Sequence, residues 1–510
     1  MAYLIGIDVG TSGTKTVLFD EEGKALASRT VEYPLHTPNP GWTEQDPEDW
    51  WNAAVNSIQA VLGESGVDAS EIKGVGLSGQ MHGSVFMDEK NQVVRPAILW
   101  NDSRTADECH EITQTIGAEK LIQLASNPAL TGFTAPKAVW LKNHEPENFK
   151  RTKTLFLPKD YVRFRLTGEI AMEVSDGAGT LLFNVKERSW CHEILDGLGI
   201  PRDWMPKLYE STDVCGTITG EIAALTGLKE GTPVVGGGAD NACGATGTGV
   251  VVEGRVLSSL GTSGVILGPS AKPDTDPQGR AHTFCHSVPN MWYLMGVILS
   301  AGMSLRWYRD VVADSERQEG AEEGRDPYDI LTTLAEKAPV GSEGLIFLPY
   351  LTGERTPLKD PYARGGFIGL TIRHQRRHLI RAVLEGITFA MRDSLEIFRS
   401  LGVEINEVRA TGGGAKSAFW KQLQADIYGC EIATIGSDQG PAFGAAIMAG
   451  VGSGVYASIP EACDAIIKVV QRTEPDAGRV KEYDEYYAVY HSLYPGIREA
   501  CHTLSKKLAS

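Results

Sequence analysis

The sequence lacks any long apolar run, and no stretch approaches the roughly 18 to 20 unbroken apolar residues of a membrane span. Its first ten residues, MAYLIGIDVG, carry no basic segment and reach an acid at Asp8, unlike a secretory signal peptide. Basic residues are also few: 48 Lys and Arg stand against 65 Asp and Glu, a formal net charge of −17. The sequence therefore predicts no membrane segment and no nucleic-acid partner held by phosphate contacts.

The cysteines are few and scattered, and none has a CxxC or similar zinc-binding spacing. This pattern favours reduced thiols over a disulfide framework and predicts a cytoplasmic protein. Hydrophobic residues make up 42% of the chain and charged residues 22%, as in ordinary globular proteins. What the chain has in excess is glycine, at 57 residues, and the clusters of glycine carry most of the functional information.

The first 80 residues predict an α/β start. Short apolar runs at 3–9, 14–20 and 24–33, joined by tight turns, predict an antiparallel meander. A helix is expected over 46–63, because Asp46 and Pro47 are typical of a helix start and apolar residues follow at helical spacing. A further strand is expected at 73–78.

A similar pattern returns near residue 230 and suggests an internal repeat. The run Ile7–Gly13, IDVGTSG, resembles Leu260–Gly264, LGTSG, and each joins two strands through a Gly-Thr-Ser-Gly turn. A repeat with a period of about half the chain predicts two related domains. We place them at residues 1–247 and 248–510.

The Gly-Thr-Ser-Gly turns are the first candidate binding elements. Small residues let backbone N–H groups approach an anion, and Thr11, Ser12 and Lys15 add further donors. Asp8, at the end of the preceding strand, could hold a hydrated Mg²⁺. One such turn alone is more typical of a plain hairpin, but two in corresponding halves favour a polyphosphate held between them.

Later segments supply a third glycine cluster and several helices. Gly412–Gly414 follow a strand that begins near 407, and three glycines in a row let backbone lie against a planar base. An amphipathic helix is expected over 417–428, with Phe419, Leu423 and Ile427 on one face. A small-residue helix is expected over 440–450, and a charged surface helix over 480–510.

The run Gly236–Asn241, GGGADN, places an acid and an amide at a strand end. A carboxylate there could take a proton from a hydroxyl group as a general base. Asp240 could also cap the helix expected over 242–250, and the two roles are compatible. The glycines do not have the order of a dinucleotide-binding fingerprint.

Two more loops follow apolar strands and carry polar groups suited to a polyhydroxylated ligand. The first is Ser78–Gly83, SGQMHG, with Met81 and His82; the second is Ile98–Arg104, ILWNDSR, with Trp100. A lone histidine is more often structural than functional, but His82 stands in a glycine-containing turn at a strand end, so both roles stay open for it. Trp100 could equally belong to the core.

These segments, in this order, resemble the FGGY family of carbohydrate kinases over nearly the whole chain. DVGTSGTK and SLGTSG resemble the two phosphate segments, VRATGGGAKS the adenosine segment, and VVGGGADNACGATGTG and GPAFGAAIMAG the two connecting segments. Residues 132–144 and 365–385 resemble the two family signatures, although Ala138 is smaller than the residue usual there.

The resemblance implies an actin-like (ribonuclease H-like) two-domain ATPase fold with an interdomain cleft, and ATP and Mg²⁺ as cofactors. It implies that Asp240 is the general base, that Asp8 organises the metal through water, and that Met81, His82, Trp100 and Asn241 contact the sugar. The nucleotide contacts that it implies are Thr11, Ser12, Lys15, Thr262, Gly302, Gly413, Gly414 and Ser417.

The sugar loops are most similar to those of members that phosphorylate D-xylulose at O5. Ribulose and gluconate remain alternatives, and glycerol is disfavoured because its kinases carry an Arg-Glu pair where this chain has Met81-His82. An actin-like nucleotide-dependent scaffold is the non-enzymatic alternative. The expected partners are ATP and a small sugar, with no nucleic acid or membrane, and a homodimer is possible.

Overall fold

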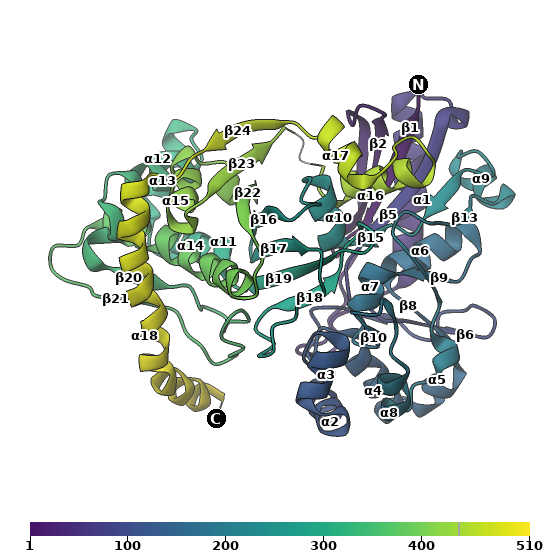
Figure 1. Cartoon of the computed structure of the whole chain (residues 1–510), viewed down its shortest axis with the longest axis horizontal. Coiled ribbons are helices and arrows are strands. Elements are labelled where there is room, and N and C mark those ends of the chain that lie inside the picture. The colour runs from purple at the N-terminus through teal and green to yellow at the C-terminus, as the bar shows by residue number, and fades with distance from the viewer. Residues whose placement is uncertain (437–438, 510) are drawn as a thin grey trace.

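Two mixed β-sheets divide the chain between them (Figure 1). The computed structural model describes residues 1–436 and 439–509. Strands of the first sheet come from residues 3–239, and strands of the second sheet come from residues 254–473. No helix in the described part of the chain is both long and apolar enough to cross a membrane. All eight cysteines are free, and all but Cys109 are buried, as the scattered spacing predicted.

The first sheet begins with the meander that the sequence predicted. β1 (Tyr3–Val9), β2 (Gly13–Asp20) and β3 (Ala25–Glu32) pair antiparallel in chain order. β5 (Ile72–Gly79) lies parallel to β1 on its other side, so this strand carries the chain to the centre of the sheet. The remaining strands are β13 (Val214–Thr217), β14 (Pro233–Val235) and β15 (Gly238–Ala239).

The second sheet repeats the pairing of the first. β16 and β17 form a hairpin, β19 pairs antiparallel with β17, and β22 lies parallel to β16. β23 then pairs parallel with β22, and β24 antiparallel with β23, just as β14 and β13 follow β5. The bounds are β16 (Gly254–Leu260), β17 (Gly264–Ser270), β18 (His282–Cys285), β19 (Trp292–Ile298), β22 (Ile405–Gly412), β23 (Glu431–Ile435) and β24 (Val469–Thr473). The repeat suggested by the two turns thus extends to whole sheets.

Helix α16 (Pro441–Gly452) ties the two halves together, because it comes from the second half and packs on the first sheet (Figure 1). The approach is close enough to require glycine: a Cβ on Gly6 would lie 1.8 Å from the carbonyl oxygen of Ala442, and one on Gly76 would lie 2.0 Å from that of Ala445. The small-residue composition of α16 therefore serves close packing, as expected. α10 (Asp240–Gly247) packs against it.

The other predicted helices form with small differences. α1 (Pro47–Ser65) starts where predicted, and its N-cap Asp46 accepts from the backbone N–H of Glu48. α15 (Ala418–Tyr428) buries Leu423 and Ile427, whereas Phe419 is half-buried. α18 (Ala477–Ala509) is longer than predicted, and it is no purely surface helix because Tyr483 and Tyr490 are buried in the core of the second half.

The remaining elements cover the sheets or extend from them. In the first half these are β4 (Glu44–Gln45), β6 (Val85–Asp88), β7 (Ala97–Ile98), α2 (Ala106–Ile116), α3 (Ala118–Ala125), α4 (Thr134–His144), α5 (Pro146–Arg151), β8 (Thr152–Phe156), α6 (Pro158–Thr167), β9 (Ala171–Glu173), α7 (Val174–Ala178), β10 (Phe183–Asn184), β11 (Ser189–Trp190), α8 (His192–Leu198), β12 (Lys207–Tyr209) and α9 (Gly220–Thr226). In the second half these are α11 (Ala301–Val311), α12 (Asp314–Glu323), α13 (Pro327–Glu336), β20 (Ile346–Leu348), β21 (Gly366–Ile368), α14 (Arg376–Ser400) and α17 (Ile459–Ile466).

Candidate active site

The two predicted carboxylates meet at one edge of the first sheet. Asp8 lies near the end of β1, and Asp240 directly follows β15. Both strands run parallel to β5 and pair with it on opposite sides, so their carboxyl ends lie together. Asp240 is the first residue of α10, and the N-cap position belongs to Ala239. Asp240 therefore is not the N-cap of α10, the additional role that the sequence left open for it.

Burial makes both carboxylates weak enough acids to exchange protons near neutral pH. It raises the pKa of Asp240 to about 7, and the nearby charge of Asp8 adds to the rise. The pKa of Asp8 is raised to about 6, again chiefly by burial. Asp240 Oδ1 accepts from the backbone N–H of Asn241 at 2.7 Å and from its side-chain amide at 3.0 Å. Within the described residues, Oδ2 of Asp240 has no hydrogen-bond partner, so this oxygen is available to take a proton.

A cavity of about 320 Å³ joins Asp240 to the second half of the chain. Asp240 and Asn241 line it from the start of α10, and Ser259, Thr411 and Gly412 line it from the ends of β16 and β22. The cavity therefore lies between corresponding edges of the two sheets. A group that enters it contacts both halves at once.

The first Gly-Thr-Ser-Gly turn is held by a hydrogen-bonded chain that includes Trp100. The indole N–H of Trp100 donates to Thr11 Oγ1 at 3.0 Å, and Thr11 Oγ1 donates to Gln80 Oε1 at 3.1 Å. Ser12 is exposed at the tip of the turn. Lys15 Nζ donates to Gln439 Oε1 at 2.9 Å, so this lysine reaches a loop of the second half. Trp100 is 42% exposed. Because its indole N–H is already bonded to Thr11, Trp100 can contact a ligand only through the face of its ring.

Met81 and His82 form a strained turn that other side chains hold in place. His82 has a φ of 68°, in the left-handed region that side chains rarely adopt. Its carbonyl oxygen accepts from Lys137 Nζ at 2.8 Å and from Thr134 Oγ1 at 3.1 Å. Lys137 and Thr134 belong to the first signature segment, 132–144. The segment therefore fixes the backbone of the predicted sugar loop, and strain of this kind is typical of functional sites.

The His82 imidazole is neutral and presents one nitrogen lone pair. Burial lowers its pKa well below the usual value. Its Nδ1 lies 2.6 Å from the carbonyl oxygen of Gly179, which can only accept, so Nδ1 carries the proton. Nε2 is therefore an acceptor. The amide of Asn241 lies 3.5 Å from the sulfur of Met81, so the Met81–His82 turn lies beside the residue that follows Asp240.

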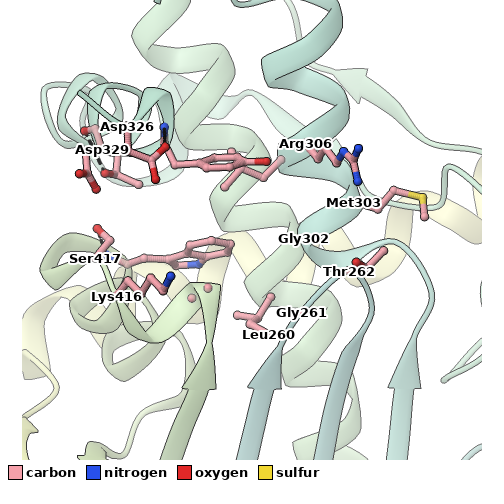
Figure 2. Close-up of a pocket in the computed structure, with 16 residues that line it drawn as sticks. Leu260, Gly261, Thr262, Gly302, Met303, Arg306, Asp326, Asp329, Lys416 and Ser417 are labelled. Carbon is pink, nitrogen blue, oxygen red and sulfur yellow. Dashed lines mark hydrogen bonds between the residues drawn. The ribbon is translucent and has the colours of Figure 1, made fainter. Parts of the chain in front are cut away.

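The predicted adenosine residues line a separate cavity of about 400 Å³ (Figure 2). Ser417 and Lys416 face Asp326 and Asp329 across it, and Thr262 and Gly302 lie at its other end. Gly302 fits there only as glycine, because a Cβ would lie 2.2 Å from the carbonyl oxygen of Gly261. The hydroxyl of Ser417 also accepts from the backbone N–H of Trp420, as the N-cap of α15. Of the predicted nucleotide residues, Thr262, Gly302, Gly413, Gly414 and Ser417 thus share one cavity.

Sequence reasoning missed several residues of these sites. Tyr328, Arg306 and Asp326 line the cavity of the predicted adenosine residues from α13, α11 and the loop between α12 and α13, where no motif marks them. Trp420 also lines it, and its position three residues after Ser417 is a signal that could have been used. Lys137 lies inside the first signature segment, but nothing in the sequence distinguishes it from its neighbours as the residue that holds the turn at His82.

The carboxylate of Asp8 fits a magnesium ion that binds together with the phosphates of a nucleotide. Oδ1 of Asp8 is buried and has no hydrogen-bond partner among the described residues, as expected of an oxygen facing hydrated Mg²⁺. No group of three or more His, Cys, Asp or Glu side chains with metal-binding geometry occurs within residues 1–436 and 439–509. Water and nucleotide oxygens would complete the shell of an ion held at Asp8.

The chain matches a family of sugar-phosphorylating enzymes in both halves. Residues 3–247 match the N-terminal domain of the FGGY family of carbohydrate kinases, and residues 256–453 match its C-terminal domain. The chain belongs to this family, and it is a carbohydrate kinase that uses ATP as co-substrate. The resemblance drawn from the glycine clusters is confirmed.

Individual relatives agree with the family over almost the full length. The chain is 43% identical to a xylulose kinase of Bacillus subtilis (strain 168) over 494 residues, 97% of either chain. It is 32% identical to a gluconokinase of the same strain, covering 96% of this chain and 95% of the other. The solved structure of a xyloylose kinase from Brucella ovis, 37% identical, covers 98% of this chain and 100% of its own, with a TM-score of 0.91. The expected two-domain, actin-like α/β fold is confirmed.

Proposed function

We propose that the protein transfers the γ-phosphoryl group of ATP to O5 of D-xylulose, giving D-xylulose 5-phosphate and ADP. One observation carries the proposal: a base-competent Asp240 adjoins Asn241 and Met81 in a site whose imidazole is a neutral acceptor. Such a site suits a neutral, hydroxyl-rich sugar. The identity to the xylulose kinase of Bacillus subtilis supports the choice of sugar.

Each predicted residue has a place in this reaction. Asp240 accepts the proton of the attacking hydroxyl, while Asn241, Met81, His82 and the ring of Trp100 hold the sugar. The turns at Thr11, Ser12 and Thr262, together with Lys15, hold the phosphates, and Gly302, Gly413, Gly414 and Ser417 border the adenosine. Phosphoryl transfer depends mainly on positioning and charge compensation, which this arrangement supplies.

Asp8 would hold Mg²⁺ through a water molecule. The ion supplies positive charge to the phosphate oxygens, which this acidic chain provides only sparingly. We also propose that residues 1–247 and 248–510 act as the two domains that enclose the substrates. The cytoplasmic location and the homodimer stay predictions.

The test of the function is ADP release with Mg²⁺-ATP and a panel of xylulose, ribulose, gluconate, glycerol and water. We expect the highest kcat/KM with xylulose. A higher value with ribulose or gluconate would agree with a sugar kinase but would contradict xylulose as the preferred substrate. If no sugar stimulates ADP release and the protein forms polymers that sediment in the presence of ATP, the actin-like scaffold would be favoured instead.

The pKa of Asp240 predicts how the rate depends on pH. The base must be deprotonated, so kcat/KM for MgATP should fall about tenfold per pH unit below about pH 7. Below about pH 6 the fall should steepen, because Asp8 becomes protonated as well. Initial rates between pH 5 and pH 9 measure this profile, and a flat profile from pH 5 to pH 8 would contradict the role of Asp240.

Gly413→Val tests the nucleotide cavity. A Cβ at Gly413 would meet only the carbonyl oxygen of Leu260, at 3.7 Å, so the fold should tolerate the larger residue. Because Gly413 lines the cavity, we expect KM for ATP to rise at least about tenfold, the loss of about 1.4 kcal/mol of binding, while KM for the sugar changes little. Gly63→Val is the matched control, since a Cβ there also meets open space, in α1. An unchanged KM for ATP would contradict the assignment.

A further inference from the structure

Two buried side-chain amides hold carbonyl oxygens of the first Gly-Thr-Ser-Gly turn. Gln45 Nε2 donates to the carbonyl oxygen of Thr11 at 2.7 Å, and Gln80 Nε2 donates to that of Gly10 at 3.3 Å. The hydroxyl of Tyr33 also donates to the carbonyl oxygen of Gly10, at 2.5 Å. Both glutamines are almost fully buried. Gln45 belongs to β4 and lies outside the motifs that marked the site in the sequence.

The direction of each hydrogen bond in this pair of amides follows from one indole. Trp50 Nε1 can only donate, so the atom of Gln45 that it meets at 3.0 Å is the carbonyl oxygen Oε1. Gln80 Nε2 donates to the same Oε1 at 3.0 Å, and Oε1 of Gln80 is left to accept from Thr11 Oγ1 at 3.1 Å. Neither amide can be reversed without losing a partner, so both present a donor to the turn.

The held carbonyls determine where the N–H groups of the turn point. In a trans peptide unit the N–H points opposite to the C=O, and within the described residues only the Thr356–Pro357 bond is cis. The carbonyls of Gly10 and Thr11 face one bonded pair of amides, so the next N–H groups, of Thr11 and Ser12, both point away from that pair. Neither N–H has an acceptor in the described part of the chain. Successive N–H groups that point to one side form a concave site for an anion such as phosphate.

The second Gly-Thr-Ser-Gly turn is held at the same two carbonyls by different donors. The carbonyl oxygen of Gly261 accepts from the backbone N–H of Gly302 at 3.0 Å. The carbonyl oxygen of Thr262 accepts from the backbone N–H of Met303 at 2.9 Å. Both donors lie in the first turn of α11, whose N–H groups have no partner within the helix. In the first half, the two glutamine side chains take the place of this helix, so both turns depend on the same hold.

We propose that Gln45 is a positioning residue of the phosphate site: it holds the carbonyl of Thr11 so that the N–H groups of Thr11 and Ser12 point together toward the phosphates of ATP. The inference rests on the proposed function, which assigns the turn at Thr11 and Ser12 to the phosphates. Because Gln45 is fully buried, it acts through the turn and not by contact with the nucleotide.

The test compares the binding of MgATP with that of adenosine, which has no phosphate, by calorimetry. Gln45→Met keeps the length of the side chain but donates no hydrogen bond. We expect the Kd of MgATP to rise and kcat/KM for MgATP to fall, each about 10- to 100-fold, as for weakened hydrogen bonds to a charged group. The Kd of adenosine should change less than about threefold. KM for the sugar should change equally little, because the backbone N–H of Gln80 is bonded separately to the carbonyl oxygen of Val9 at 2.9 Å.

Two further variants separate this role from a loss of packing. Gln45→Asn keeps a buried amide that is one carbon too short to reach the carbonyl of Thr11, and we expect it to share the loss of MgATP affinity. Thr16→Val is the matched control, because it removes a buried hydrogen bond to Ser57, of 2.7 Å, in the same hairpin but outside the turn. Its melting temperature should fall, while its Kd for MgATP should stay within about twofold of the wild type.

Three results would overturn the inference and leave the function intact. The first is an equal loss of affinity for MgATP and adenosine in Gln45→Met, and the second is a Kd for MgATP within about threefold of the wild type in that variant. The third is a loss in Thr16→Val as large as that in Gln45→Met. If Gln45→Met does not fold, an unchanged Kd for MgATP in Gln45→Asn would also overturn it. A wild-type enzyme that binds MgATP no more tightly than adenosine would overturn the assignment of the turn to the phosphates, and the inference with it.

Discussion

Asp240→Asn should lower kcat by about 10² to 10⁴-fold, the usual loss when a positioned general base is removed. The amide keeps the size of the side chain and can still accept from the backbone N–H of Asn241, but it cannot take the proton of the sugar hydroxyl. ATP binding should survive, because Asp240 does not line the cavity that holds the predicted adenosine residues. The measurements are ADP release with saturating xylulose and the binding of ATP by calorimetry.

Thermal unfolding gives this variant a second readout. The pKa of Asp240 is raised in the folded protein, so the folded state binds more protons than the unfolded state between about pH 4 and pH 7. Stability is therefore lost as the pH rises through this range, and above pH 7 Asp240→Asn should melt at a higher temperature than the wild type. Asp213→Asn, a change outside the cavities, is the control. Near-normal turnover by Asp240→Asn would contradict its role as the base.

Asp8→Asn should lower kcat by about 10² to 10³-fold, the range seen when one preorganised electrostatic contact to the reacting groups is lost. The concentration of Mg²⁺ needed for half-maximal rate should rise, because the oxygen of Asp8 that has no protein partner would lose its charge. Rates across a Mg²⁺ titration at fixed ATP measure both effects.

The Asp8→Asn change should also lower the pKa of Asp240, the proposed base. The charge of Asp8 raises the pKa of Asp240, so Asp8→Asn should move the acidic limb of the rate profile to lower pH. Asp20→Asn is the matched control: Asp20 lies at the far end of the same hairpin, where its carboxylate accepts from the N–H groups of Glu22 and Lys24. An unchanged metal requirement in Asp8→Asn would rule out the proposed contact.

The fold could be predicted well from the sequence, because its signals are local. Turn chemistry and alternating apolar residues predicted the hairpin of β1 and β2, and the second Gly-Thr-Ser-Gly turn predicted that a related unit follows. The extent of the repeat was less visible, because strand order depends on pairings between distant residues. The buried face of α18 was missed because charged residues outnumber its buried tyrosines.

The candidate site could be predicted only where a side chain stands in a glycine-rich motif at a strand end. Asp8, Asp240 and His82 have such positions. Lys137 and Tyr328 do not, since their importance depends on what the fold brings to them.

The most direct test of the account is to identify the product. The protein is incubated with Mg²⁺-ATP and D-xylulose labelled with ¹³C at C5, and the sugar phosphate is analysed by ³¹P and ¹³C NMR. The account predicts one ester whose phosphorus couples to C5, formed in equal amount to ADP. A phosphate on another carbon, or ADP formed without any sugar phosphate, would contradict it.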